Sequence, residues 1–228
     1  MPEQQFQSAE RAHRSILARA EKATLLWLAA RMPRWVSSDL LTITGSVAML
    51  GAGLSYWLSR YDRRGLLLVI LFLALNWFGD SLDGTLARFR NQQRPRYGFY
   101  VDHVVDTFNT LFLLGGLALS GYISAWVAAA MLIAFYLVSI EVYLAAYTLA
   151  TFHLSMGGFG PTELRILLSI GNLYLFFRPE VPIVPIIGRG YKLFDIGGAI
   201  GAAGMTLLMC AAAIRHTRAL YKAEPLPR

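Results

Sequence analysis

Long apolar runs, separated by short polar segments, occupy most of the chain after residue 38. A helix needs about 20 largely apolar residues to cross a lipid bilayer. The first and fourth runs satisfy this requirement fully, whereas the fifth is short. The pattern predicts an all-α fold, a membrane bundle of six transmembrane helices. The runs lie at about residues 39–59, 65–90, 98–120, 122–151, 160–178 and 192–215.

Basic and apolar side chains alternate through the first 36 residues, in which Pro33 ends the segment. This alternation predicts an amphipathic helix lying along the membrane interface; the alternative is a solvated helix that caps the domain. Ser37, Ser38 and Asp39 then offer an N-cap for the first membrane helix. We therefore divide the chain into an interfacial helix (1–36), a six-helix membrane domain (37–216) and a cytoplasmic tail (217–228).

Composition and charge narrow the class of protein. A hydrophobic fraction of 56% with a mean hydropathy of +0.47 excludes an ordinary soluble domain. The net charge of +7 is spread over the ends of the apolar runs, which favours anionic lipid headgroups as partners and argues against nucleic acid. With the N-terminus inside, 15 Lys and Arg residues lie in inner segments and six in outer loops. The positive-inside rule therefore predicts that both termini and the 88–96 loop are cytoplasmic.

Four aspartates flank the loop between the second and third runs. Asp80 and Asp83 are three residues apart and Asp102 and Asp106 are four apart, so each pair shares a helical face. Because Pro95 marks a turn between two antiparallel helices, we expect the four carboxylates to converge. Facing carboxylates repel one another unless cations lie between them. A cluster without Cys or paired His suits hard cations such as Mg²⁺ or Mn²⁺.

A longer pattern surrounds these aspartates, Asp80-x2-Asp83-Gly84-x2-Ala87-Arg88-x9-Gly98-x3-Asp102-x3-Asp106. It resembles the signature of the CDP-alcohol phosphotransferase (CDP-alcohol phosphatidyltransferase) family at all eight fixed positions over 27 residues. The apolar runs resemble that family's six-helix membrane domain. The resemblance implies an enzyme of phospholipid biosynthesis that transfers a substituted phosphate from a CDP-linked donor to an alcohol, with release of CMP. We expect the site to open to the cytoplasm of a bacterial or archaeal cell.

The resemblance also assigns roles to the carboxylates. It implies that Asp80, Asp83 and Asp102 bind metal, as two Mg²⁺ or Mn²⁺ ions. It implies that Asp106 helps to bind metal and is the base that deprotonates the acceptor hydroxyl. Many members of the family carry Pro-Asn before the first span, where this chain has Ser38-Asp39. This departure puts the donor contact at that point in doubt.

Small residues in the motif are implied to line the cytidine nucleotide site, namely Gly84, Ala87 and Gly98. Gly84 and Ala87 lack bulk, so a nucleotide can approach their helix face closely; plain helix packing is the alternative. Arg88 follows Ala87 directly. Its guanidinium suits a bidentate contact with a phosphate, or an ion pair with a motif carboxylate.

Four further polar residues are candidates for recognising the acceptor. Arg165 is the strongest, because a guanidinium binds phosphate or carboxylate groups well. Glu141 lies within the fourth run, where an unpaired charge is costly, so it pairs with a partner such as Arg165 or contacts the substrate. His153 and Glu163 lie between the fourth and fifth runs. A lone histidine in such a place is more often structural than catalytic.

Small and amide side chains within the runs indicate how the helices pack. Gly197 and Gly201 permit close helix packing, and we favour packing within the chain over a seam between two copies. The family commonly forms homodimers, which adds a second copy to the expected partners by analogy. Asn76 and Asn109 flank the motif helices, where they line a cavity or form interhelical hydrogen bonds.

Three functions compete on these grounds. In the first, CDP-diacylglycerol donates to a small polar alcohol such as inositol phosphate, glycerol phosphate or serine. In the second, CDP-choline or CDP-ethanolamine donates to a lipid alcohol; chain length favours the first. In the third, the aspartates form the transport site of a divalent-cation transporter, which leaves the small residues and the arginine of the motif unexplained.

Overall fold

The computed structural model describes residues 18–149, 161–178, 180–186 and 189–224, which form seven helices and one short hairpin. The all-α class is confirmed, apart from the hairpin, which was not predicted. Among the described residues, five helices (α2, α3, α4, α5 and α7) are long and apolar enough to cross a membrane. α6 has 17 residues and is shorter, so the sixth span stays a prediction. The elements are α1 (Ala18–Arg31), α2 (Ser38–Leu58), α3 (Arg64–Phe89), α4 (Pro95–Ser120), α5 (Ala125–Leu149), α6 (Pro161–Phe177), β1 (Ile183–Ile186), β2 (Arg189–Lys192) and α7 (Leu193–Ala223).

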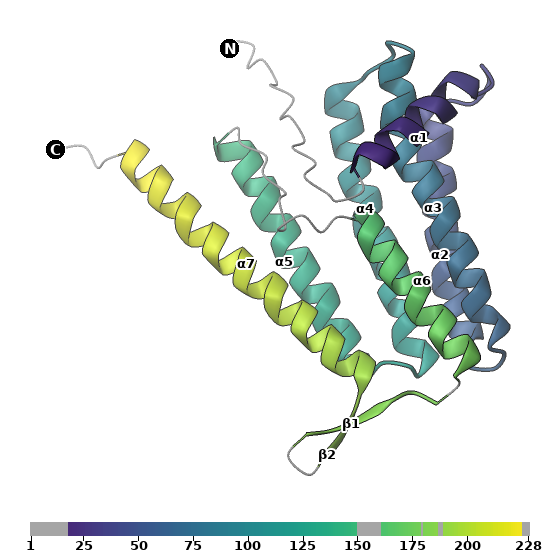
Figure 1. The fold of residues 1–228 in the computed structure, drawn as a ribbon. Coiled ribbons are helices and arrows are strands. Elements are labelled where there is room, and N and C mark those ends of the chain that lie inside the picture. Colours follow the sequence, from purple (N-terminus) through teal and green to yellow (C-terminus); the bar gives the residue numbers. More distant parts are fainter. Residues whose placement is uncertain (1–17, 150–160, 179, 187–188, 225–228) are drawn as a thin grey trace.

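The helices from α2 to α7 run alternately up and down the bundle (Figure 1). The turn between α3 and α4 lies at one end, and α1 lies across the same end (Figure 1). The antiparallel β1–β2 hairpin lies at the opposite end (Figure 1). α5 and α7 pack along each other and lean away from the other helices. The end that carries α1 and the α3–α4 turn is the one we expect to face the cytoplasm.

Local sequence explains where the motif helices begin and end. Ser37 is the N-cap of α2, because its side chain accepts a hydrogen bond from the Leu40 backbone nitrogen at 3.1 Å. After α3, Asn91 adopts a left-handed conformation with φ 55°, which asparagine tolerates better than most residues. Pro95 then occupies the first turn of α4, where its missing N–H has no cost. The predicted turn is therefore present, and it is shorter than the sequence suggested.

α2 holds the two motif helices together. It packs closely against both α3 and α4, whereas α3 and α4 hardly approach each other. The close approach depends on facing glycines. A Cβ on Gly79 would lie 2.5 Å from the Leu41 carbonyl oxygen, and a Cβ on Gly116 would lie 2.0 Å from the Gly53 carbonyl oxygen. The motif helices are therefore not a tightly packed hairpin, since each is positioned by α2.

The predicted glycine contact in α7 is wrong within the described residues. A Cβ on Gly197 or Gly201 would have nothing within 4 Å. The neighbouring Gly198 packs instead, and a Cβ there would lie 2.7 Å from the Val127 side chain of α5. Gly198 faces α5 because one residue along a helix turns the side chain by about 100°.

α1 covers the outer face of the motif half of α3. Leu25 and Ala29 of α1 are buried in one cluster with Leu82 and Leu86 of α3. A second cluster fills the other half of the bundle and joins α2, α3 and α6. Trp27 of α1 stays 55% exposed, as an aromatic anchor at a membrane interface would be. α1 thus caps the bundle, and its place along the membrane stays a prediction.

A side chain at Gly116 should destabilise the bundle. Gly116→Ala brings a Cβ against the Gly53 carbonyl, whereas Gly115→Ala meets nothing within 4 Å. The atoms that the new Cβ meets belong to the backbone and cannot move aside. We therefore expect Gly116→Ala to lower the free energy of unfolding by about 1–3 kcal/mol. The thermal unfolding midpoint in detergent should fall for this variant and stay unchanged for Gly115→Ala. Equal midpoints would contradict the close contact of α2 with α4.

Candidate active site

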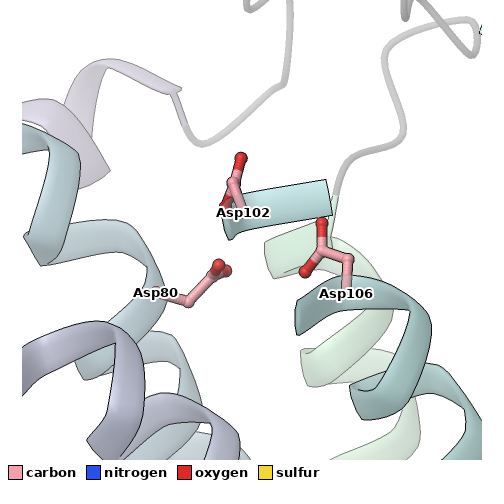
Figure 2. Close-up of side chains that lie close together, drawn as sticks. All are labelled: Asp80, Asp102 and Asp106. Carbon is pink, nitrogen blue, oxygen red and sulfur yellow. The ribbon is translucent and has the colours of Figure 1, made fainter. Parts of the chain in front are cut away.

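Three carboxylates meet between α3 and α4. Asp80 of α3 and Asp102 and Asp106 of α4 each place one carboxylate oxygen so that all three lie within 4.8 Å of one another. Figure 2 shows the three side chains around one common space. Asp102 and Asp106 share a face of α4 because they are one turn apart. All three are half-buried, so they are shielded from solvent and still open on one side.

Asp83, the fourth aspartate of the motif, turns toward α2. Its carboxylate accepts a hydrogen bond from Thr42 Oγ1 at 2.7 Å and a further one from the Gly84 backbone nitrogen. It lies near enough to Asp80 and Asp102 for electrostatic repulsion between the carboxylates. The structure therefore groups three of the four predicted carboxylates and holds the fourth beside them.

Arg165 of α6 joins the site through Asp80. Its guanidinium Nη2 lies 2.5 Å from Asp80 Oδ2, and its Nε donates to Asn76 Oδ1 at 2.9 Å. The Asn76 amide in turn donates to the Gly45 carbonyl of α2 at 3.0 Å. Arg165 is thus fixed against the carboxylate cluster by two side chains of α3. The interhelical hydrogen bond predicted for Asn76 is confirmed.

The suggested pairing of Glu141 with Arg165 is wrong. Glu141 of α5 instead pairs with His216 of α7, with 2.6 Å between Oε1 and Nδ1. Both residues lie where α5 and α7 pack together. They are far apart in the sequence, so no local pattern predicts that they pair. Glu163 is half-buried in the first turn of α6, and His153 lies outside the described residues.

The residues predicted to bind the nucleotide extend away from the carboxylates along α3 and the start of α4. A Cβ on Gly84 would lie 3.4 Å from the Arg88 guanidinium, so Arg88 folds back over this glycine. Arg88 also donates to Thr85 Oγ1 at 3.2 Å. Ala87 is half-buried. Gly98 is exposed, and a Cβ built on it would have nothing within 4 Å. Open space is therefore present beside Gly98 of α4, whereas Arg88 covers Gly84 of α3.

The first two residues of α2 take structural partners. Asp39 forms an ion pair with Arg94 of the α3–α4 turn, and Ser38 Oγ donates to the Asp83 carbonyl at 2.9 Å. Arg90 donates to the carbonyl oxygens of Met32 and Val36. Two arginines of the α3–α4 turn, Arg90 and Arg94, therefore bind the α1–α2 connection and the start of α2.

The sequence analysis missed several residues that shape the site. Tyr143 of α5 lies edge-on to His103, with 4.8 Å between ring centroids, and His103 directly follows Asp102. Ser46 of α2 donates to Asn109 Oδ1 of α4 at 3.0 Å. Thr42 is three residues after Asp39 and one turn before Ser46. A polar stripe on one face of α2 was the available signal for these contacts.

Comparisons with known proteins identify the family of this chain. The sequence profile of the CDP-alcohol phosphatidyltransferase family matches residues 35–213. An uncharacterised CDP-alcohol phosphatidyltransferase class-I family protein of Dictyostelium discoideum is 27% identical over 172 residues, which are 68% of this chain and 42% of that protein. An archaetidylinositol phosphate synthase of Pyrococcus horikoshii is 31% identical over 104 residues, 46% of this chain and 52% of that protein. The chain thus spans about half the length of these relatives.

A solved structure shares the fold. The crystal structure of Mycobacterium tuberculosis phosphatidylinositol phosphate synthase with CDP-DAG bound matches with a TM-score of 0.50 and 19% identity. The match covers 89% of this chain and 92% of the other. The profile spans most of the chain, including all four aspartates, the helices α2 to α5 and α7 as far as residue 213. The chain therefore belongs to the CDP-alcohol phosphatidyltransferase family and is an integral membrane protein.

Proposed function

We propose that this chain transfers a phosphatidyl group from CDP-diacylglycerol to a small alcohol, with release of CMP and with dependence on divalent metal. The observation that carries the proposal is the group of Asp80, Asp102 and Asp106 with Arg165 at its edge. Membership of a transferase family removes the cation transporter from consideration. The solved relative with CDP-DAG bound supports this donor over a CDP-linked amino alcohol.

The carboxylates suit Mg²⁺ or Mn²⁺. The donor set consists of oxygen atoms alone, and three of them surround one space, as hard cations require. Asp80, Asp102 and Asp106 would hold a first ion, and Asp83 would help to hold a second by giving up the hydrogen bond from Thr42. When bound, such ions supply charge neutralisation to the donor diphosphate.

Asp106 is the proposed base. It lies one turn beyond Asp102 on α4, at the edge of the carboxylate group. In the reaction the acceptor oxygen forms a bond to the phosphatidyl phosphorus, the bond from that phosphorus to CMP breaks, and Asp106 takes the hydroxyl proton. A carboxylate is a weak base near neutral pH, so the orientation of the acceptor must supply much of the rate.

Gly84 and Ala87 of α3, together with Gly98 at the start of α4, would bind the nucleotide. Gly84, Ala87 and Gly98 leave room beside the backbone, and Arg88 lies over Gly84 with its guanidinium available to shift onto a phosphate. Arg88 already has protein partners, so a ligand would exchange with these contacts.

Arg165 is the proposed acceptor residue. Its guanidinium lies beside the carboxylate group and would bind a phosphate carried by the acceptor. The archaetidylinositol phosphate synthase relative supports a phosphorylated polyol as the acceptor class. Glu163 stays a further candidate, whereas Glu141 is engaged by His216.

We also propose that the site faces the cytoplasm, as the distribution of basic residues indicates. Membrane lipids would surround the helices, and a homodimer stays a proposal by analogy with the family.

Divalent metal should stabilise the purified protein. Ligands that bind only the folded state raise the unfolding midpoint, so Mn²⁺ or Mg²⁺ should raise it in detergent. Asp102→Asn should lose most of this shift, because it removes a charged ligand of the proposed ion. The control Glu180→Gln changes an exposed glutamate that is distant in sequence from the four aspartates, and it should keep the full shift. A full shift in Asp102→Asn would place the ion elsewhere.

The wild-type protein should release CMP from CDP-diacylglycerol only when an alcohol is present. Among acceptors, phosphorylated polyols such as inositol phosphate or glycerol phosphate should exceed serine, because Arg165 offers a site for the phosphate. Mass spectrometry of the lipid product, with and without excess EDTA, measures this. Preference for CDP-choline with diacylglycerol would overturn the donor assignment, and full turnover in EDTA would overturn the metal dependence.

Asp106→Asn and Asp80→Asn should differ. General-base catalysis contributes about 10² to 10⁴ in rate, so Asp106→Asn should lose at least that much turnover. It should still bind CDP-diacylglycerol, because Asp80, Asp83 and Asp102 remain to hold a metal and the donor diphosphate. Asp80→Asn should weaken donor binding as well, because it loses a metal ligand. Parallel donor-binding and turnover assays separate the two effects. Near-normal turnover of Asp106→Asn across a pH series would show that another group takes the proton.

A further inference from the structure

One carboxylate of α1 joins the two helices that carry Asp80 and Arg165. Glu21 Oε1 accepts a hydrogen bond from Trp77 Nε1 of α3 at 2.9 Å and one from Thr162 Oγ1 of α6 at 2.8 Å. Ser81 Oγ of α3 is a longer donor to the same oxygen, at 3.4 Å. α1 precedes the segment matched by the family profile, which begins at residue 35. Glu21 is therefore a feature outside the shared domain.

The partners of Glu21 are one helical turn from the site residues. Trp77 precedes Asp80 by three residues, and Thr162 precedes Arg165 by three residues. Residues three apart lie on neighbouring positions of a helix face. A single oxygen atom thus links the turn before Asp80 to the turn before Arg165.

The start of α6 contacts both α1 and α3 through polar side chains. Among the described helices α6 packs mainly on α3, and its buried apolar contact, Leu175, lies near its far end. At its start Thr162 contacts Glu21, and Arg165 contacts Asp80 and Asn76. If the acceptor draws Arg165 from Asp80, the Glu21 contact still holds this end of α6 against α3.

α1 is itself held firmly enough to act in this way. Leu25 and Ala29 are buried against Leu82 and Leu86 of α3. Beyond the end of α1, Arg90 donates to the Met32 carbonyl at 3.0 Å and to the Val36 carbonyl. The helix is thus attached at both ends, and Glu21 lies at the end nearer α6.

We infer that Glu21 is a positioning residue that sets the place of Arg165 relative to Asp80, and so the affinity for the acceptor. This inference rests on the proposed function. Glu21 acts as a hydrogen-bond acceptor for two helices, so the oxygen matters and the negative charge does not. Its loss should weaken acceptor binding and leave the donor side, built on the motif residues of α3 and α4, largely as it is.

Glu21→Gln and Glu21→Leu separate these roles. Gln keeps a side-chain oxygen that accepts from Trp77 and Thr162, whereas Leu keeps similar bulk without an acceptor. We expect Glu21→Leu to raise the acceptor KM roughly tenfold, the loss expected from about one or two hydrogen bonds. The KM for CDP-diacylglycerol should stay within about twofold of wild type, and Glu21→Gln should keep both KM values. Equal rises of both KM values, or a defect in Glu21→Gln as large as in Glu21→Leu, would overturn the inference.

Two further variants guard against simple misfolding. Thr162→Val removes only the α6 hydroxyl and should reproduce the rise in acceptor KM. Thr24→Val is the matched control on α1, since its hydroxyl donates only to the Ala20 carbonyl of its own helix; it should match wild type. A normal acceptor KM in Thr162→Val would contradict the link even if Glu21→Leu fails to fold.

A measurement without turnover distinguishes this inference from the proposed function. If Glu21 and Thr162 are coupled, the double variant Glu21→Leu/Thr162→Val should lower the unfolding midpoint no more than Glu21→Leu alone. Additive losses would show that the two residues act separately. Coupling without CMP release from any donor and acceptor pair would leave the link intact and reject the transferase role.

Discussion

Asp80, Asp102 and Asp106 repel one another, and the packing of the bundle has to oppose that repulsion. At 4.8 Å two unit charges repel by about 3 kcal/mol when the effective dielectric constant is about 20. α3 and α4 hardly touch, so their own packing does not hold the carboxylates together. The opposing contacts come from α2, where Gly79 and Gly116 let the backbones approach without intervening side chains. The guanidinium of Arg165 balances part of the charge that this packing concentrates, through its ion pair with Asp80.

A buried amide sets the orientation of that guanidinium. Asn76 is only 1% exposed, and it donates to the Gly45 carbonyl while accepting from Arg165. An unsatisfied polar group in a membrane interior costs several kcal/mol, so both partners of Asn76 have to remain in place. The amide therefore ties α2, α3 and α6 together within one turn of Asp80. Arg165 approaches the carboxylates from a fixed direction, which favours recognition of a substrate group over loose charge balance.

Sequence reasoning was reliable where a local pattern determines the structure. The spacing from Asp80 to Asp106 predicted the motif helices, the turn and the meeting of three of the four carboxylates, because helical period and proline geometry act over a few residues. It failed where contacts join helices distant in sequence. Glu141 pairs with His216, and Asp83 accepts a hydrogen bond from Thr42. In α7, Gly198 packs against α5 and Gly197 does not. Each of these contacts depends on which face a helix presents to its neighbours. The β1–β2 hairpin is likewise formed by a segment with no alternating polar pattern.

The position of α1 shows how a segment outside a shared domain can affect its chemistry. The motif residues proposed to bind the donor lie on α3 and α4. The position of these two helices relative to each other depends on α2. α6 carries Arg165 and lacks that support, because it packs mainly on α3. A contact from α1 also reaches the start of α6, where Thr162 donates to Glu21. In the proposed reaction the carboxylates and the acceptor residue Arg165 are thus supported by different helices, and this arrangement would let acceptor preference change through α1 and α6 while the carboxylate motif stays the same.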